Sequence, residues 1–147
     1  MNINKKQNMN LNETTQQIKQ IVDWYHNLTP DYTGINDLMY QRIQLATLLF
    51  YYSVELGEVR KQWKQCEAET EISKRQAIKR MIDEGSAITK ATEHGKIMSL
   101  DEYAMEKQLD GLYHSMKFIY DSGSEILNTI NQHISNLKRE LEPGSKY

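Results

Sequence analysis

Four basic side chains fall within seven residues near the middle of the sequence, in the run KRQAIKR. They are Lys74, Arg75, Lys79 and Arg80, and no acid separates them. Ammonium and guanidinium groups suit phosphate oxygens, which accept charge-assisted hydrogen bonds from them. The chain as a whole carries a formal charge of −2, so the cluster is a local feature of a near-neutral protein. Its simplest chemistry is contact with a polyanion.

Residues suited to catalysis form no recognisable pattern. The four histidines are scattered, at positions 26, 94, 114 and 133. Gly95-Lys96 lacks the earlier glycine and the following Ser or Thr of a phosphate-binding loop. Glu93-His94 is the nearest approach to a reactive pair, and it is typical of an ordinary polar turn. We therefore expect no enzyme, no cofactor and no metal site.

Composition favours elongated helices in one domain. The 147 residues are 39% apolar and 26% charged, with seven glycines and two prolines. A single cysteine, Cys66, excludes an internal disulfide framework and suits a reducing cytoplasm. No apolar run approaches the ~18 residues of a membrane span. We therefore expect a cytoplasmic protein with no membrane partner.

Hydrophobic periodicity predicts an all-α protein with a single helical domain at 13–142. Residues 1–12 are rich in Asn, Lys and Gln and are expected to form a disordered tail, and 143–147 form a second tail. Helices are expected at about 13–28, 36–83 and 100–141. A short helix at 87–94 would be capped by Ser86 and ended by Gly95. Whether the second helix is continuous through Thr70 stays open, because its apolar pattern weakens after position 63.

The last long helix carries the clearest pattern. Its apolar residues recur at alternating spacings of four and three from Met105 to Ile130, and the row resumes at 134–141. Ser99-x-x-Glu102, just before it, has the form of a capping box. A similar row covers 38–63 in the second helix. Two such helices joined by a short connector favour a long antiparallel hairpin with coiled-coil packing.

Further apolar residues lie beside these rows, and a two-helix hairpin cannot bury them all. Phe50 and Tyr51 flank one row, and Tyr113 and Tyr120 flank the other. We expect the first helix and further copies of the chain to cover them, giving a homo-oligomeric helical bundle. The residues expected in the core or between copies are Leu49, Tyr52, Leu56, Trp63, Leu112, Met116, Ile119 and Ile126.

Two interpretations of the basic cluster stay open. Between 57 and 82, seven basic residues outnumber four acids, whereas the start of the last helix is acidic. Its acids are Asp101, Glu102, Glu106 and Asp110. In an antiparallel hairpin the two stretches could neutralise each other, at about 0.5 kcal/mol or less per exposed contact. Alternatively the cluster faces solvent and contacts phosphates, and an oligomer multiplies it into a ring of charge.

Several features together resemble the phage UvsY family of recombination mediators. The likeness covers roughly 38–141: a Tyr-rich helix (LATLLFYYSVEL), a run ending in AIKRMIDEG, a glycine-containing connector, LDEYAMEK and a long closing helix. The resemblance implies a small oligomeric protein that binds single-stranded DNA and helps to load a RecA-like recombinase. In that family a basic pair before the connector is implicated in DNA binding. The matching positions here are Lys79 and Arg80, although they are adjacent in this chain.

We therefore expect an accessory protein that self-associates, binds single-stranded DNA and assists a recombinase. Arg75, Lys79 and Arg80 are the expected phosphate contacts, with Lys74 in support. One alternative is a structural or protein-binding helical module, such as a virion, scaffolding or adaptor protein. Another is a small inhibitor of a host enzyme that binds through the acids at 101–110.

Overall fold

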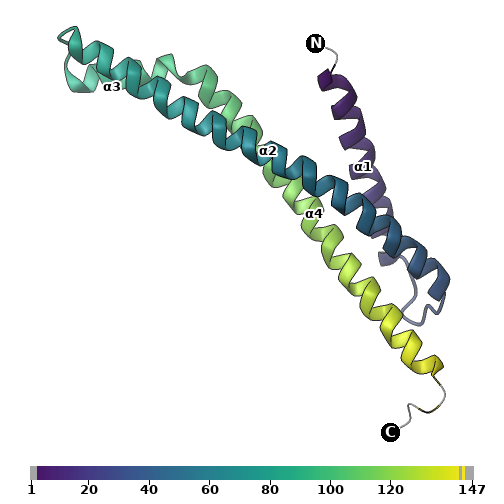
Figure 1. Ribbon diagram of the computed structural model, residues 1–147. Helices are drawn as coiled ribbons and strands as arrows, with labels where there is room; N and C mark the ends of the chain where they lie inside the picture. Colours follow the sequence, from purple (N-terminus) through teal and green to yellow (C-terminus); the bar gives the residue numbers. More distant parts are fainter. Residues whose placement is uncertain (1–2, 143, 145–147) are drawn as a thin grey trace. The chain divides into compact units, whose positions relative to one another are not determined.

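Four α-helices make up the chain in this computed structural model, which describes residues 3–142 and Gly144, with side-chain surroundings from Leu11 onward (Figure 1). Helix α1 spans Ile3–His26, α2 spans Ile35–Asp83, α3 spans Ile88–Met98 and α4 spans Leu100–Leu141. No strand occurs among the described residues. The expected all-α fold of long, mutually packed helices is confirmed.

Helix α1 begins at Ile3 rather than at 13, so residues 3–12 are helical where their composition predicted a disordered tail. Leu11 and Thr14 of α1 line a recess with Leu48 and Tyr52 of α2. Contact with α2 therefore extends into the segment that composition assigned to the tail. The helix ends at His26 instead of 28. Positions 1–2, 143 and 145–147 of the two expected tails lie outside the described residues.

Helix α2 is continuous through Thr70, which settles the question left open by its weak apolar pattern. The Thr70 hydroxyl donates to the Cys66 carbonyl at 2.8 Å, and the residue is buried. Because the hydroxyl is satisfied within its own helix, a polar side chain is tolerated at an inward position. Cys66 and Thr70 thus continue, with smaller side chains, the inward-facing row that covers 38–63.

The chain divides into two compact units. The first comprises the described parts of Met1–Glu55 and Lys117–Tyr147, and the second comprises Leu56–Met116. Helices α2 and α4 contribute to both units, whereas α1 belongs to the first and α3 to the second. The sequence had suggested one domain at 13–142.

The first unit has an apolar core shared by α1, α2 and α4. Leu49 and Ile18 pack at Gly123, where an added Cβ would lie 2.8 Å from Leu49 Cδ2 and 3.2 Å from Ile18 Cγ2. The three helices approach closely at that point because glycine has no side chain. The other fully buried side chains of this core include Leu38, Leu45, Tyr52, Ile130 and Ile134.

The second unit has fewer buried apolar side chains than the first, and its core includes an aromatic pair. Trp63 of α2 stacks on Tyr113 of α4 with ring centroids 5.3 Å apart and planes at 28°. Val59 and Met116 are buried. Because both rings are only half-buried, this unit depends on few fully enclosed apolar groups.

The connection between α3 and α4 departs from the sequence prediction. Helix α3 continues to Met98, and Gly95 lies buried inside it rather than ending it. The residue that precedes α3 is Ala87, without a side-chain cap, so the expected Ser86 cap is wrong. The Ser99 hydroxyl donates to the carbonyls of Gly95 and Lys96, at 3.0 and 3.3 Å. It therefore closes α3 instead of forming a capping box at the start of α4.

The residues expected in the core or between copies differ in their exposure. Among the set named from the sequence, those buried within one chain are Leu49, Tyr52, Met116 and Ile126. Those half-buried are Leu56, Trp63 and Ile119. Leu112 is 41% exposed and contributes little to the packing of a single chain. At the start of α4 the inward side chains are instead Glu102, Glu106, Leu109 and Tyr113.

Candidate nucleic-acid interface

The four residues of the basic cluster lie in the last turns of α2, within the second unit. Arg75, Lys79 and Arg80 are exposed, whereas Lys74 is half-buried. Cations near a helix C-terminus are stabilised by the helix dipole. The helix therefore holds these side chains on a regular backbone and leaves three of them in solvent.

Lys74 differs from the other three because it faces the acidic side of the unit. It lines a recess together with Glu67, Glu71, Lys96 and Glu106, which come from α2, α3 and α4. A phosphate at this position would meet three carboxylates. Lys74 is therefore the weakest candidate of the four for an anion contact.

Arg75 makes one ion pair, with Glu71 one turn earlier on α2. The Arg75 Nε to Glu71 Oε2 distance is 3.8 Å, and the two side chains are 83% and 56% exposed. An exposed pair of this kind contributes about 0.3–0.5 kcal/mol. Arg75 can therefore exchange Glu71 for a phosphate at little cost.

Lys79 and Arg80 show no ion pair within 4.0 Å among the described residues. They line an open recess with Gln76 and Asp83 of α2 and with Glu84, the residue after the helix. The two acids lie one turn beyond the two cations. They lower the local positive charge without forming an ion pair with either cation. Of the sequence-predicted contacts, Lys79 and Arg80 are the most available to a ligand.

The described ion pairs do not connect the basic stretch of α2 with the acids of α4. Each of the six pairs joins residues three or four positions apart in one helix. Asp110 is engaged by His114 and Lys107, at 2.8 and 4.0 Å. Direct neutralisation between the two stretches, one of the two interpretations of the sequence, is therefore not seen among the described residues.

A wider row of cations emerges when the exposed face of α2 is followed toward its start. Lys61, Lys64, Arg75 and Lys79 fall within an arc of about 60° at 100° per residue, opposite the buried Val59 and Thr70. We call these four residues the basic row. Arg80 lies about 100° further round the helix. The sequence prediction included neither Lys61 nor Lys64 among the contacts, although their spacing from Arg75 places them on its face.

The aromatic residues of the second unit serve packing more than base stacking. Trp63 and Tyr113 are occupied by each other, and the Lys64 ammonium lies 4.3 Å from the Trp63 ring centre. Tyr103 is the most exposed aromatic of this unit, at 49%. A base could therefore stack on Tyr103 but not on the Trp63–Tyr113 pair.

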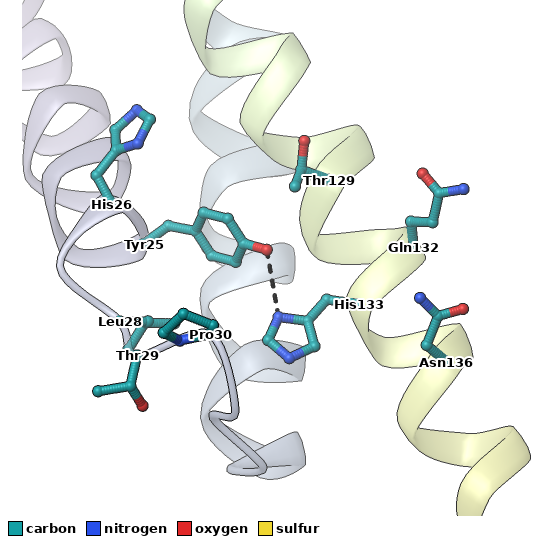
Figure 2. A pocket seen from close by; sticks show the side chains of 9 residues that line it. All are labelled: Tyr25, His26, Leu28, Thr29, Pro30, Thr129, Gln132, His133 and Asn136. Atoms are coloured by element: carbon teal, nitrogen blue, oxygen red, sulfur yellow. Dashed lines mark hydrogen bonds between the residues drawn. The ribbon is translucent and has the colours of Figure 1, made fainter.

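A polar recess in the first unit centres on His133 (Figure 2). His133 Nε2 lies 2.9 Å from the Tyr32 carbonyl, which can only accept, so Nε2 carries a hydrogen. In the neutral ring Nδ1 then accepts from the Tyr25 hydroxyl at 3.2 Å. Burial raises the pKa of Tyr25. These bonds connect α1 and the loop after it to α4, which is a structural role.

Within the part of the chain that the structure describes, no three His, Cys, Asp or Glu side chains are grouped so that they could hold a metal ion. None of the helices, over the same residues, has the length and apolar content to cross a membrane. Comparison with protein-family models finds no match, and neither the curated proteins nor the solved structures include a significant match.

Proposed function

We propose that this protein is a non-enzymatic, self-associating accessory protein that binds single-stranded DNA along the exposed face at the end of α2. The phosphate contacts are Arg75, Lys79 and Arg80, extended by Lys61 and Lys64. Following the resemblance to the UvsY family, the bound strand is presented to a RecA-like recombinase.

One observation carries the proposal: Lys79 and Arg80 are exposed and have no acidic partner within ion-pair distance among the described residues. A cation already in a strong pair must lose that partner before it can bind phosphate. Cations held in solvent lose only hydration water, and release of the counter-ions condensed on the polyanion drives binding.

The test is fluorescence anisotropy with a labelled oligothymidine across a salt titration. Binding should weaken steeply with salt, and each lost phosphate contact should reduce the log–log slope by about 0.7 for a single strand. The variant Lys79→Ala/Arg80→Ala removes two charges from the proposed site. Its matched control, Lys90→Ala/Lys138→Ala, removes two exposed charges from α3 and α4. Equal losses in both variants, or no binding by the wild type at low salt, would refute the proposal.

A second candidate function, a protein-binding or structural helical module, is favoured by exposed apolar side chains. Phe50 and Tyr51 of α2 and Phe118 of α4 are 66%, 62% and 71% exposed. Large apolar groups gathered on a surface are typical of protein interfaces. No comparable observation favours the inhibitor alternative, because Glu102, Glu106 and Asp110 are half-buried.

A further inference from the structure

The solvent-facing side of α2 in the first unit carries an apolar row that one chain leaves uncovered. It consists of Tyr40, Ile43, Thr47, Tyr51 and Val54, spaced three, four, four and three apart. The four apolar members are between 58% and 62% exposed, and Thr47 is also exposed. We call these five residues the outer row. They fall within about 80° on the side of α2 opposite Leu45 and Leu49.

The area of the outer row is near the minimum that a specific pairing of two chains requires. Tyr40 and Tyr51 each leave roughly 100 Å² or more in solvent, and with Ile43, Val54 and the adjacent Phe50 the patch reaches roughly 400–500 Å². A patch of this size is comparable to the largest apolar patch on a typical monomer, and such patches are often functional. Two such patches would bury roughly 800–1,000 Å², near the lower limit for a specific interface.

The pattern of the outer row is unchanged when its direction is reversed. Counting outward from Thr47, residues lie four positions away on both sides (Ile43 and Tyr51) and seven positions away on both sides (Tyr40 and Val54). When two copies run antiparallel, each aromatic ring therefore meets a smaller aliphatic side chain. A twofold interface needs a surface that complements itself in this way, whereas an unrelated partner does not.

We propose that the outer row is the interface between two copies of this chain, paired antiparallel with Thr47 at the twofold axis. The inference assigns a surface to the self-association in the proposed function and does not depend on DNA binding. The outer row holds no charge. Asp37 and Glu55 flank it, and Asp37 of one copy would lie near Glu55 of the other. Added salt should therefore leave pairing unchanged or strengthen it, whereas it weakens binding to a polyanion.

Cysteine cross-linking tests both the surface and the orientation. In a Cys66→Ser background, Thr47→Cys should form a disulfide-linked dimer under mild oxidation, because residues at a twofold axis meet their own copies. Tyr40→Cys alone and Val54→Cys alone should not cross-link. In the antiparallel pair the two copies of either cysteine lie 14 helical positions apart, or about 21 Å. A mixture of the two variants should cross-link, because position 40 of one copy lies opposite position 54 of the other. Disulfides require Cα atoms within about 7 Å. Asn128→Cys, exposed on α4, measures collisional cross-linking.

Light scattering provides a test without engineered cysteines. The wild type should show at least twice the 17.3 kDa of one chain. Val54→Asp should shift the mass toward that of the single chain, with its helical circular dichroism retained. Phe118→Asp makes the same kind of change at an exposed residue of α4 outside the outer row, and it should leave the mass unchanged.

Three results would overturn the inference. They are a monomeric wild type, a Val54→Asp variant that keeps the wild-type mass, and cross-linking of Tyr40→Cys alone at the yield of Thr47→Cys. The last result would indicate parallel helices. Because none of these measurements contains DNA, their failure is distinguishable from failure of the DNA-binding proposal.

Discussion

Replacing Gly95 by alanine perturbs a close contact between α3 and α2. A Cβ at Gly95 would lie 2.6 Å from Ile78 Cγ1 and 3.0 Å from the Lys74 carbonyl oxygen. The first of these atoms belongs to a β-branched side chain with little rotational freedom. The second belongs to the backbone of α2 and cannot move alone. Alanine is therefore accommodated only if α3 shifts away from α2.

The expected magnitude follows from two opposing effects. Alanine is favoured over glycine inside a helix by about 1 kcal/mol, and overpacking of a close contact costs about 1–3 kcal/mol. Gly95→Ala should therefore lower the free energy of unfolding by up to about 2 kcal/mol. Gly111 of α4, in the same unit, has no atom within 4 Å of an added Cβ. Gly111→Ala should raise the free energy of unfolding by about 0.5–1 kcal/mol.

Urea unfolding followed by circular dichroism gives the comparison, with wild type, Gly95→Ala and Gly111→Ala measured together. Hydrogen exchange at the backbone amides of α3 adds a local measurement, because α3 can open without global unfolding. Exchange should accelerate in α3 for Gly95→Ala and not for Gly111→Ala. If the two variants change stability in the same direction and by the same amount, the reasoning from close approach is wrong.

Two further predictions concern the first unit. Burial raises the pKa of Tyr52, and the hydrogen bond from Thr15 partly opposes this. A raised pKa means that the folded state favours neutral Tyr52. This contribution to the free energy of unfolding is fully present below the ordinary tyrosine pKa of about 10, and it is lost as the pH rises through the pKa of Tyr52 in the folded state. Urea unfolding on both sides of that pH should therefore show a smaller alkaline loss for Tyr52→Phe, and an equal loss would contradict this origin. His133→Leu leaves the Tyr32 carbonyl without its donor, and thermal unfolding should show a loss of about 1–3 kcal/mol in stability. Tyr25→Phe removes one neutral hydrogen bond and should cost about 0.5–1.5 kcal/mol. A larger loss for Tyr25→Phe than for His133→Leu would contradict the assigned bonds.

Periodicity predicted the parts of the fold that depend on one helix at a time. The expected bounds of 36–83 and 100–141 match α2 and α4 closely, because apolar spacing reports directly which face is buried. The row of α4 is buried from Gly123 to Leu137 as its spacing predicts. Ahead of Met116 the inward face differs: Tyr113 stacks on Trp63 of α2 and is half-buried, whereas Leu112 is exposed.

Local signals were less informative where a neighbouring helix decides the outcome. Gly95 has the sequence signature of a helix stop, yet it lies inside α3, close to the backbone of α2 at Lys74. Ser99 has the signature of an N-cap, yet its hydroxyl bonds backward to α3. Glycine serves both roles and serine bonds in both directions, so a single sequence does not separate the alternatives.

The candidate site was predictable in its position along the helix and not in its partners. Helical angles alone place Arg75 and Lys79 on the side of α2 opposite its core. Whether the acids at 101–110 reach them depends on the separation and the relative rotation of the helices. The sequence contains neither quantity.

Because α2 carries both the outer row and the basic row, pairing through the first would bring two copies of the second into one particle. A strand long enough to occupy both would be held by the second contact at an effective concentration set by the strand itself. Affinity would then depend on oligonucleotide length. Val54→Asp removes no cation and touches no phosphate, yet it would weaken binding to long strands and leave short ones unaffected. The protein would then discriminate between strands by their length and not by their base composition.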